Sequence, residues 1–232
     1  MSTSVIKRIV SKDLKGIKTN DLNSMGIFVE FNEENLLEAK AMIIGPKDSV
    51  YEGGILFFKL FYPKNYPFSP PDVCYVSRNK VRIHPNYYTR HHHTGHGKVC
   101  LSILGTWDGP KWTSIMDTST ILITMQSLLD KNPLYHEPKI EDPILINNYN
   151  KIINHESIQT LFLRNTFDIP IGFEIFTEEI KENYEKNKDY LFDKIQKNIN
   201  IKEKVFSNIY RFDYPVDYKR LSEVFKEYSQ KL

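Results

Sequence analysis

One of the two cysteines, Cys100, lies in a segment whose neighbouring residues could support chemistry on a thiol. Residues 97–101 read Gly-Lys-Val-Cys-Leu, and the tripeptide His84-Pro85-Asn86 precedes them by a loop. A thiolate can attack an acyl carbon and carry the acyl group as a thioester. An amide side chain fixed near a proline can donate a hydrogen bond to an oxyanion. These residue types predict acyl transfer through Cys100, aided by Asn86.

The remaining chain must position these groups, and its bulk properties describe an ordinary globular scaffold. The 232 residues are enough for one large domain, or for a medium domain with an appendage. The net charge of +2 is too small to indicate nucleic acid binding by overall charge. No apolar run reaches the length of a membrane span, and the N-terminus lacks an apolar signal core. Two cysteines do not make a disulfide framework, so we expect cytoplasm or nucleus.

The N-terminal half predicts a helix followed by a sheet. Residues 4–18 have an amphipathic pattern, with an expected apolar stripe of Ile6, Ile9, Val10, Leu14 and Ile17. The opposite basic face is either a solvated surface or a docking surface for an acidic partner. Short apolar runs at 27–31, 38–44, 55–62 and 73–76 predict four antiparallel strands with helix over one face. The second cysteine, Cys74, falls in the last run and is expected to be a small buried hydrophobe.

The C-terminal half predicts helices. Apolar residues recur at helical spacing over 118–131, 143–153, 155–167, 173–199 and 217–230. Pro133 ends the first of these, and Ile169-Pro170-Ile171-Gly172 interrupts the series. The 173–199 helix carries an apolar stripe that must cover something: Phe173, Phe176, Ile180, Tyr184, Leu191 and Ile195.

Taken together, these motifs resemble the ubiquitin-conjugating enzyme family. They occur in the family's order: a basic first helix, a four-strand meander, Tyr-Pro-Phe-Ser-Pro-Pro at 66–71, His-Pro-Asn at 84–86, Gly-Lys-Val-Cys-Leu at 97–101 and Trp107. The sequences of 100–107 and 132–138 are similar to those of the large ubiquitin-conjugating enzyme Z branch, which also carries C-terminal helices. The resemblance implies an α/β (α+β) ubiquitin-conjugating core at 1–168 and a helical extension at 169–232.

The resemblance also implies a function and a set of site residues. Cys100 would accept ubiquitin or a ubiquitin-like protein from an activating enzyme and pass it to a substrate lysine, usually with a ligase. Asn86 would bind the oxyanion, hold the nearby loop, or both, with Pro85 fixing the backbone beside it. His84 is expected to be a structural hydrogen-bonding residue. The protein itself would need no cofactor or metal, since only the activating enzyme uses ATP.

The family's partner surfaces fall on identifiable residues. The activating enzyme and ligases would share the first helix, so loading and discharge should alternate. The exposed aromatic that ligases grip corresponds to Phe68, and the 107–112 loop supplies a third contact. The expected partner-binding residues are Lys7, Arg8, Lys12, Lys15, Phe68 and Lys111.

The sequence departs from the family pattern at two places. Residues 90–96 (Arg-His-His-His-Thr-Gly-His) look like an insertion. We expect this segment to be a polar loop rather than a metal site, because no cysteine or carboxylate is interleaved. The acidic residue that prepares the incoming lysine in many family members has no clear counterpart. His136 or Glu137 would take its role.

Two other functions stay open at the level of sequence. A catalytically silent variant would only bind ubiquitin or a partner, but the presence of both Asn86 and Cys100 argues against it. A cysteine hydrolase would need a Cys–His pair oriented by a third group, and no papain-type or caspase-type signature occurs. The extension either shapes the choice of activating enzyme and modifier or only adds stability.

Overall fold

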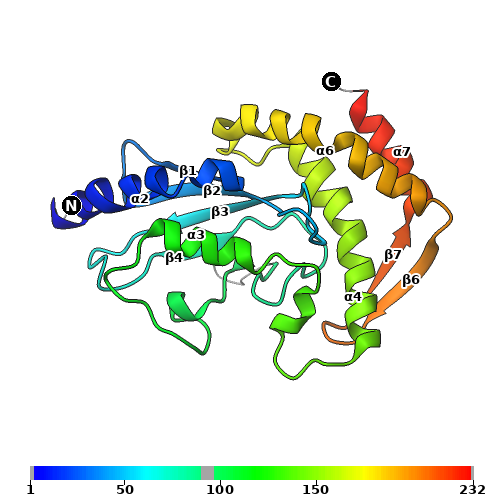
Figure 1. Ribbon diagram of the computed structural model, residues 1–232, viewed down its shortest axis with the longest axis horizontal. Coiled ribbons are helices and arrows are strands. Elements are labelled where there is room, and N and C mark those ends of the chain that lie inside the picture. Colours follow the sequence, from blue (N-terminus) through cyan, green and yellow to red (C-terminus); the bar gives the residue numbers. More distant parts are fainter. Residues whose placement is uncertain (1–2, 90–96, 231–232) are drawn as a thin grey trace. The chain divides into compact units, whose positions relative to one another are not determined.

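The computed structural model describes residues 3–89 and 97–230 of the chain (Figure 1). The chain forms two compact units. One consists of Met1–Ile43, Leu56–Ser77 and Asn86–Leu128, and the other of Ile44–Ile55, Arg78–Pro85 and Leu129–Leu232. The expected boundary between residues 168 and 169 lies within the second unit. As a limit of the family domain it stays a prediction.

An antiparallel sheet organises the first unit (Figure 1). Its strands follow one another in sequence order: β1 (Ile27–Phe31), β2 (Glu38–Ile44), β3 (Ile55–Phe61), β4 (Asp72–Tyr75) and β5 (Gly97–Lys98). The four predicted strands are confirmed. The fifth was missed because two residues are too few for an alternating pattern. Residues 55–58 are all buried, so β3 lacks the alternation of a strand with one solvated face.

The first helical segment runs through α1 (Thr3–Arg8), a π-helical stretch at Ile9–Asp13 and α2 (Leu14–Thr19). Its position agrees with the prediction, but its buried face differs. Val5, Ile9 and Asp13 are buried, whereas Val10 of the predicted stripe is 51% exposed. The difference arises because residues four apart share a helix face, and the carboxylate of Asp13 points inward on this one.

Asp13 joins three segments of the first unit. Its Oδ1 accepts hydrogen bonds from the Tyr66 hydroxyl at 2.5 Å and from the backbone N–H and hydroxyl of Thr118 at 2.8 Å each. The Thr118 hydroxyl also lies 2.6 Å from that of Tyr62. Burial raises the pKa of Tyr66, and the nearby Asp13 carboxylate adds to the effect. The tyrosine therefore stays a hydrogen-bond donor at neutral pH.

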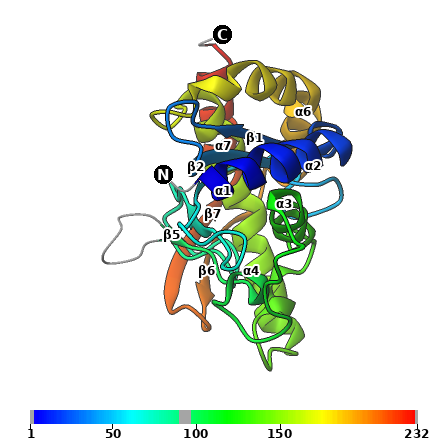
Figure 2. The ribbon, with the colours of Figure 1, turned by 90° about the vertical axis from the view of Figure 1, so that its left-hand side faces the viewer.

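Helix α3 (Thr118–Ser127) packs against α2 and β1 (Figure 2). Its N-cap is Asp117, whose carboxylate accepts the Thr120 N–H at 2.9 Å. Ile121, Leu122 and Met125 are fully buried, as the predicted periodicity requires. The helix ends before the predicted Lys131 because the Asp130 carboxylate accepts the Asn132 N–H and forms a turn.

The second unit contains a β-hairpin in addition to helices. Its helical elements are η4 (Pro133–His136), α4 (Pro143–Glu156), η5 (Ser157–Arg164), α5 (Asn165–Phe167), η6 (Glu174–Phe176), α6 (Thr177–Lys197) and α7 (Tyr218–Ser229). The two helices expected over 143–167 are one continuous run, whose middle is the π-helical η5. The prediction of a purely helical extension is wrong in one respect. Strands β6 (Lys202–Ser207) and β7 (Phe212–Asp217) form a hairpin beside α4 (Figure 1).

Aromatic rings fill the core of the second unit. Every member of the predicted stripe on the 173–199 helix is buried. The Phe162 ring stacks on Tyr184 of α6 at 5.5 Å and on Phe225 of α7 at 6.2 Å. The two C-terminal helices therefore pack on each other and on η5, as the stripe predicts.

None of the helices in the described ranges 3–89 and 97–230 is both long and apolar enough to cross a membrane.

Replacing Asp13 by alanine should lower the free energy of unfolding by about 2–4 kcal/mol, because buried hydroxyl and N–H donors lose their acceptor. Asp13→Asn, which keeps one acceptor oxygen, should lie between alanine and the wild type. Urea denaturation measures both. Asp108→Ala, at an exposed position of the same unit, is the matched control. A loss for Asp13→Ala no larger than the control's would contradict the structural role.

Candidate active site

A short antiparallel ladder brings Asn86 and Cys100 together in the first unit. The Cys100 N–H donates to the Asn86 carbonyl at 2.9 Å, Tyr87 bridges Val99, and the Tyr88 N–H donates to the Lys98 carbonyl at 3.0 Å. Gly97 closes the ladder, since a Cβ there would lie 1.7 Å from the Tyr88 carbonyl oxygen. Fourteen positions of sequence thus separate two residues that are direct neighbours in space.

The Asn86 side chain binds the backbone of the candidate nucleophile. Its Nδ2 donates to the carbonyl oxygen of Cys100 at 2.7 Å, and the two residues are 5% and 4% exposed. In this arrangement the amide holds the loop that carries the thiol. Cys100 is therefore a buried residue whose loop is fixed through its backbone.

Thr106 fastens the other side of the same loop. Its hydroxyl accepts the Leu101 N–H at 2.9 Å and lies 3.1 Å from the Val99 carbonyl oxygen. Its backbone N–H donates to the Leu101 carbonyl at 3.1 Å. The residues on either side of Cys100 are therefore held by a single threonine. Sequence analysis included Thr106 in the 100–107 motif but gave it no role, because the residue type alone does not reveal its backbone partners.

Tyr87 anchors the ladder to the sheet and to α3. Its ring lies 5.6 Å from that of Phe58 and 5.8 Å from that of Tyr75, and its hydroxyl donates to the Met125 carbonyl at 2.6 Å. Burial raises the pKa of Tyr87 far above its ordinary value, so the hydroxyl remains a donor. Tyr87 therefore packs this loop against the sheet and α3.

Cys74 is not the fully buried hydrophobe that we expected. It is half-buried on β4 and lines a groove of about 520 Å³, together with Phe61, Val73, Lys98, Val99 and Leu104 among others. Burial, and then the Asp72 carboxylate, raise the pKa of its thiol, while Lys59 opposes them. The thiol is thus mostly protonated at neutral pH and is a weak nucleophile.

The predicted supporting residues lie in the second unit, where two of them, His84 and His136, contact each other. His84 is fully buried, and its ring lies 5.1 Å from that of His136. The Nε2 of His136 lies 3.0 Å from Asp130 Oδ2. Burial tends to raise the pKa of Asp130, but the His136 contact and the Asn132 N–H outweigh it and lower that pKa. Glu137 Oε2 accepts a hydrogen bond from the Tyr210 hydroxyl at 2.7 Å.

Some of the predicted partner-binding residues are exposed, whereas others donate hydrogen bonds within the unit. Phe68 is 80% exposed, and Lys7, Lys15 and Lys111 are also exposed. Arg8 differs from the expectation of a free basic residue, because its guanidinium donates to the Ser114 and Met116 carbonyls at 3.2 and 2.7 Å. Lys12 similarly donates to the carbonyl of Ile115, whose own side chain is 75% exposed. The exposure of the apolar Ile115 side chain was not predicted.

The histidine-rich insertion at 90–96 lies outside the described residues, so its expected character stays a prediction. Within the part of the chain that the structure describes, no three His, Cys, Asp or Glu side chains form a group that could hold a metal ion.

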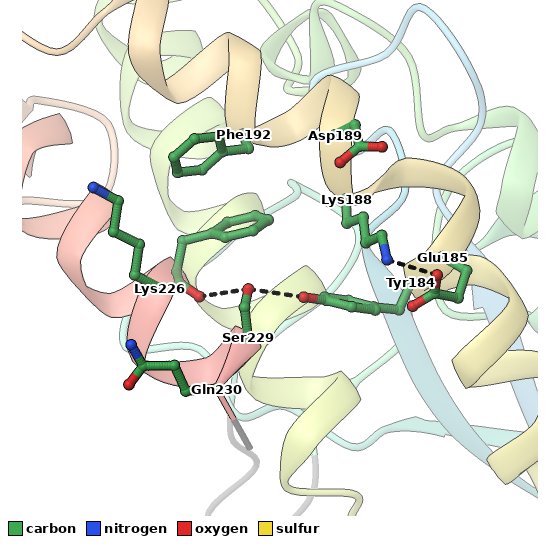
Figure 3. A pocket seen from close by; sticks show the side chains of 9 residues that line it. Tyr184, Glu185, Lys188, Asp189, Phe192, Lys226, Ser229 and Gln230 are labelled. Carbon is green, nitrogen blue, oxygen red and sulfur yellow. Dashed lines mark hydrogen bonds and ion pairs between the residues drawn. The ribbon is translucent and has the colours of Figure 1, made fainter. Parts of the chain in front are cut away.

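A second hollow of about 520 Å³ lies between α6 and α7 (Figure 3). The Phe192 and Phe225 rings line it, and its polar groups bind one another. Lys188 pairs with Glu185 at 2.6 Å, and the Tyr184 hydroxyl lies 2.9 Å from Ser229 Oγ. The lining contains no cysteine or histidine, so the hollow offers no nucleophile–base pair.

The strand order and the Asn86–Cys100 ladder define a class of fold that solved structures share. The ubiquitin-conjugating enzyme Pex4p of H. polymorpha, solved with the soluble domain of Pex22p, matches with a TM-score of 0.51 and 21% identity. The match covers 66% of this chain and 96% of that one. At this identity the likeness establishes the fold alone.

Sequence comparison establishes the family. The model of the family described as "Ubiquitin-conjugating enzyme" matches residues 9–166, and the chain belongs to that family. Ubiquitin-conjugating enzyme E2 Z of Danio rerio is 41% identical over 139 residues, and that of Homo sapiens is 42% identical over the same length. These matches cover 58% of this chain, but only 40% and 38% of the two relatives. The predicted resemblance to the Z branch is confirmed.

Replacing Thr106 by valine should make Cys100 react faster with a thiol reagent such as DTNB. Loss of one hydroxyl costs about 1 kcal/mol of local stability, which corresponds to about a fivefold faster reaction through loop opening. The measurement uses a Cys74→Ser background, so that only Cys100 reacts. Thr113→Val, at an exposed loop position, is the control. Equal rates in both variants would show that Thr106 does not hold the loop.

Proposed function

We propose that this domain accepts ubiquitin or a ubiquitin-like protein as a thioester on Cys100 and transfers it to a lysine. The observation that carries the proposal is the ladder that binds the Asn86 amide to the Cys100 backbone, in a chain of this family. The chain spans about two fifths of the length of its E2 Z relatives, and the proposal concerns the part present here.

The chemistry takes two steps. In loading, the Cys100 thiolate attacks the thioester carbonyl on an activating enzyme, a new thioester forms, and the activating enzyme's thiolate leaves. In discharge, a neutral lysine amine attacks the thioester carbonyl on Cys100. An isopeptide bond then forms, the Cys100 thiolate leaves, and the amine loses a proton. Asn86 would stabilise the oxyanion of this second step once its side chain turns from the Cys100 carbonyl.

His136 and Glu137 are the candidates for preparing the amine, as in family members that carry an acidic residue there. His84 and Pro85 would hold the backbone that precedes Asn86. We place no other group of the chain in these roles, and we propose that the domain uses no cofactor of its own. ATP would be consumed only by the activating enzyme.

The exposed groups of the first unit support a protein-binding surface. The unit exposes three lysines, Lys7, Lys15 and Lys111, and one large apolar ring, the 80% exposed Phe68. Arg8 and Lys12 would shape the surface by holding the 114–116 loop. We propose that the activating enzyme and ligases bind here in turn. Neither nucleic acid nor membrane is among the proposed partners, and the proposed location is cytoplasm or nucleus.

Neither alternative function gains support. A hydrolase needs a histidine oriented beside the thiol, and the described residues of the first unit offer none, while the histidines at 91–93 and 96 lie outside them. A silent binding variant would not need Asn86 fastened to Cys100. Loading with activating enzyme, ATP and ubiquitin separates all three functions, because only a conjugating enzyme accumulates an adduct that a reductant releases.

Cys100→Ser should abolish the reductant-sensitive adduct or trap the modifier as a stable ester, because an alkoxide is a poorer leaving group than a thiolate. Cys74→Ser should load normally, since burial raises the pKa of the Cys74 thiol and makes it a weak nucleophile. Non-reducing gels after incubation with activating enzyme and ATP measure both. A reducible adduct on Cys100→Ser would refute the assignment.

Asn86→Ala should load nearly normally but discharge to free lysine about 10²-fold more slowly, the usual cost of losing one oxyanion donor. Single-turnover discharge of purified thioester measures the rate. If Asn86 only holds the loop, the discharge rate per folded molecule should stay unchanged while the protein loses stability, and the oxyanion role would be wrong.

A further inference from the structure

The turn between β6 and β7 carries a tyrosine that contacts two segments of the candidate machinery. The Arg82 guanidinium lies over the Tyr210 ring, 4.7 Å from its centroid. The Tyr210 hydroxyl donates to Glu137 Oε2 at 2.7 Å. One side chain from the C-terminal hairpin therefore reaches both the segment before Asn86 and the segment that holds the candidate acid.

Arg82 in turn holds the backbone that leads into Asn86. Its Nη2 donates to the Pro85 carbonyl, and its Nε lies 3.4 Å from the His84 carbonyl oxygen. The Pro85 carbonyl belongs to the peptide bond whose nitrogen is that of Asn86, so fixing this oxygen fixes the plane from which Asn86 starts. The guanidinium suits this task because its planar fork donates to two acceptors while its face stacks on a ring.

The hairpin that carries Tyr210 packs against α4. Val205, Tyr214 and Val216 are buried, and the Tyr214 hydroxyl lies 2.9 Å from His155 Nδ1 and donates to Glu156 at 2.8 Å. Closer to the turn, the Tyr149 ring meets Tyr210 edge-on at 5.7 Å. The Tyr149 hydroxyl also donates to the Arg82 carbonyl at 2.6 Å, so both ends of this arginine are held.

We propose that Tyr210 is a positioning residue for the discharge step, acting through Arg82 on the 84–86 backbone and through its hydroxyl on Glu137. This inference rests on the proposed function and gives the C-terminal extension a part in the reaction. Loading requires only a reactive Cys100, whereas discharge also needs Asn86 and the group that prepares the amine. Loss of the Tyr210 contacts should therefore slow discharge selectively.

The test measures loading and single-turnover discharge to free lysine on the full chain. Tyr210→Leu removes both contacts and should slow the limiting discharge rate about tenfold, less than the ~10²-fold cost of a full 1 Å misplacement. Loading should stay within about twofold, and so should the lysine concentration at half-maximal rate. Tyr210→Phe keeps the ring over Arg82 and should recover more than half of the lost activation free energy. Phe206→Leu, which removes an exposed ring of the same hairpin, should match the wild type.

A second variant keeps the inference testable even if Tyr210→Leu fails to fold. Arg82→Lys retains the charge but loses the fork and the stacking, and should also slow discharge about tenfold. Combined with Tyr210→Leu it should add less than about twofold, since both changes break one contact chain. Wild-type discharge in Tyr210→Leu, full additivity of the pair, or equal losses in loading and discharge would each overturn the inference. A wild-type chain that does not load would instead refute the proposed function.

Discussion

The first unit depends on a single buried carboxylate. Asp13 is fully buried and gathers hydrogen bonds from Tyr66, at the start of the proline-rich loop, and from both donors of Thr118, at the start of α3. A buried carboxylate is tolerated only where donors surround it, so these segments cannot separate without exposing unpaired groups. The first helix, the Phe68 loop and α3 are therefore held together through one side chain.

The same physical logic appears around the thiol. Asn86 and Thr106 hold the Cys100 loop from two sides through backbone groups rather than through the sulfur. Because these side chains bind the backbone, the sulfur itself is not used as a hydrogen-bonding partner in either contact. Burial of Cys100 limits the access of other reagents to the free thiol.

Sequence predicted the elements with dense periodic patterns and missed those set by single contacts. The four strands and the stripe from Phe173 to Ile195 follow from spacing alone, and the structure confirms both. The inward turn of Asp13 could not be predicted, because its partners Tyr66 and Thr118 lie far away in sequence. The β6–β7 hairpin was not predicted, because its alternating buried residues, Val205, Tyr214 and Val216, form only a short pattern between two clearly periodic helices. The proximity of Asn86 and Cys100 followed from family resemblance, whereas their hydrogen bond is set by the three-dimensional path of the backbone.

The ladder of 86–88 with 97–100 has a consequence for the register of this site. Its pairing closes at Tyr88 and Gly97, where the two backbones approach too closely for any side chain at residue 97. The geometry between Asn86 and Cys100 is thus set by the neck of the hairpin and not by the number of residues beyond it. Asn86 lies opposite Cys100 as long as these backbone hydrogen bonds form. The register of the two strands therefore depends on Gly97, since any side chain there would push the backbones apart.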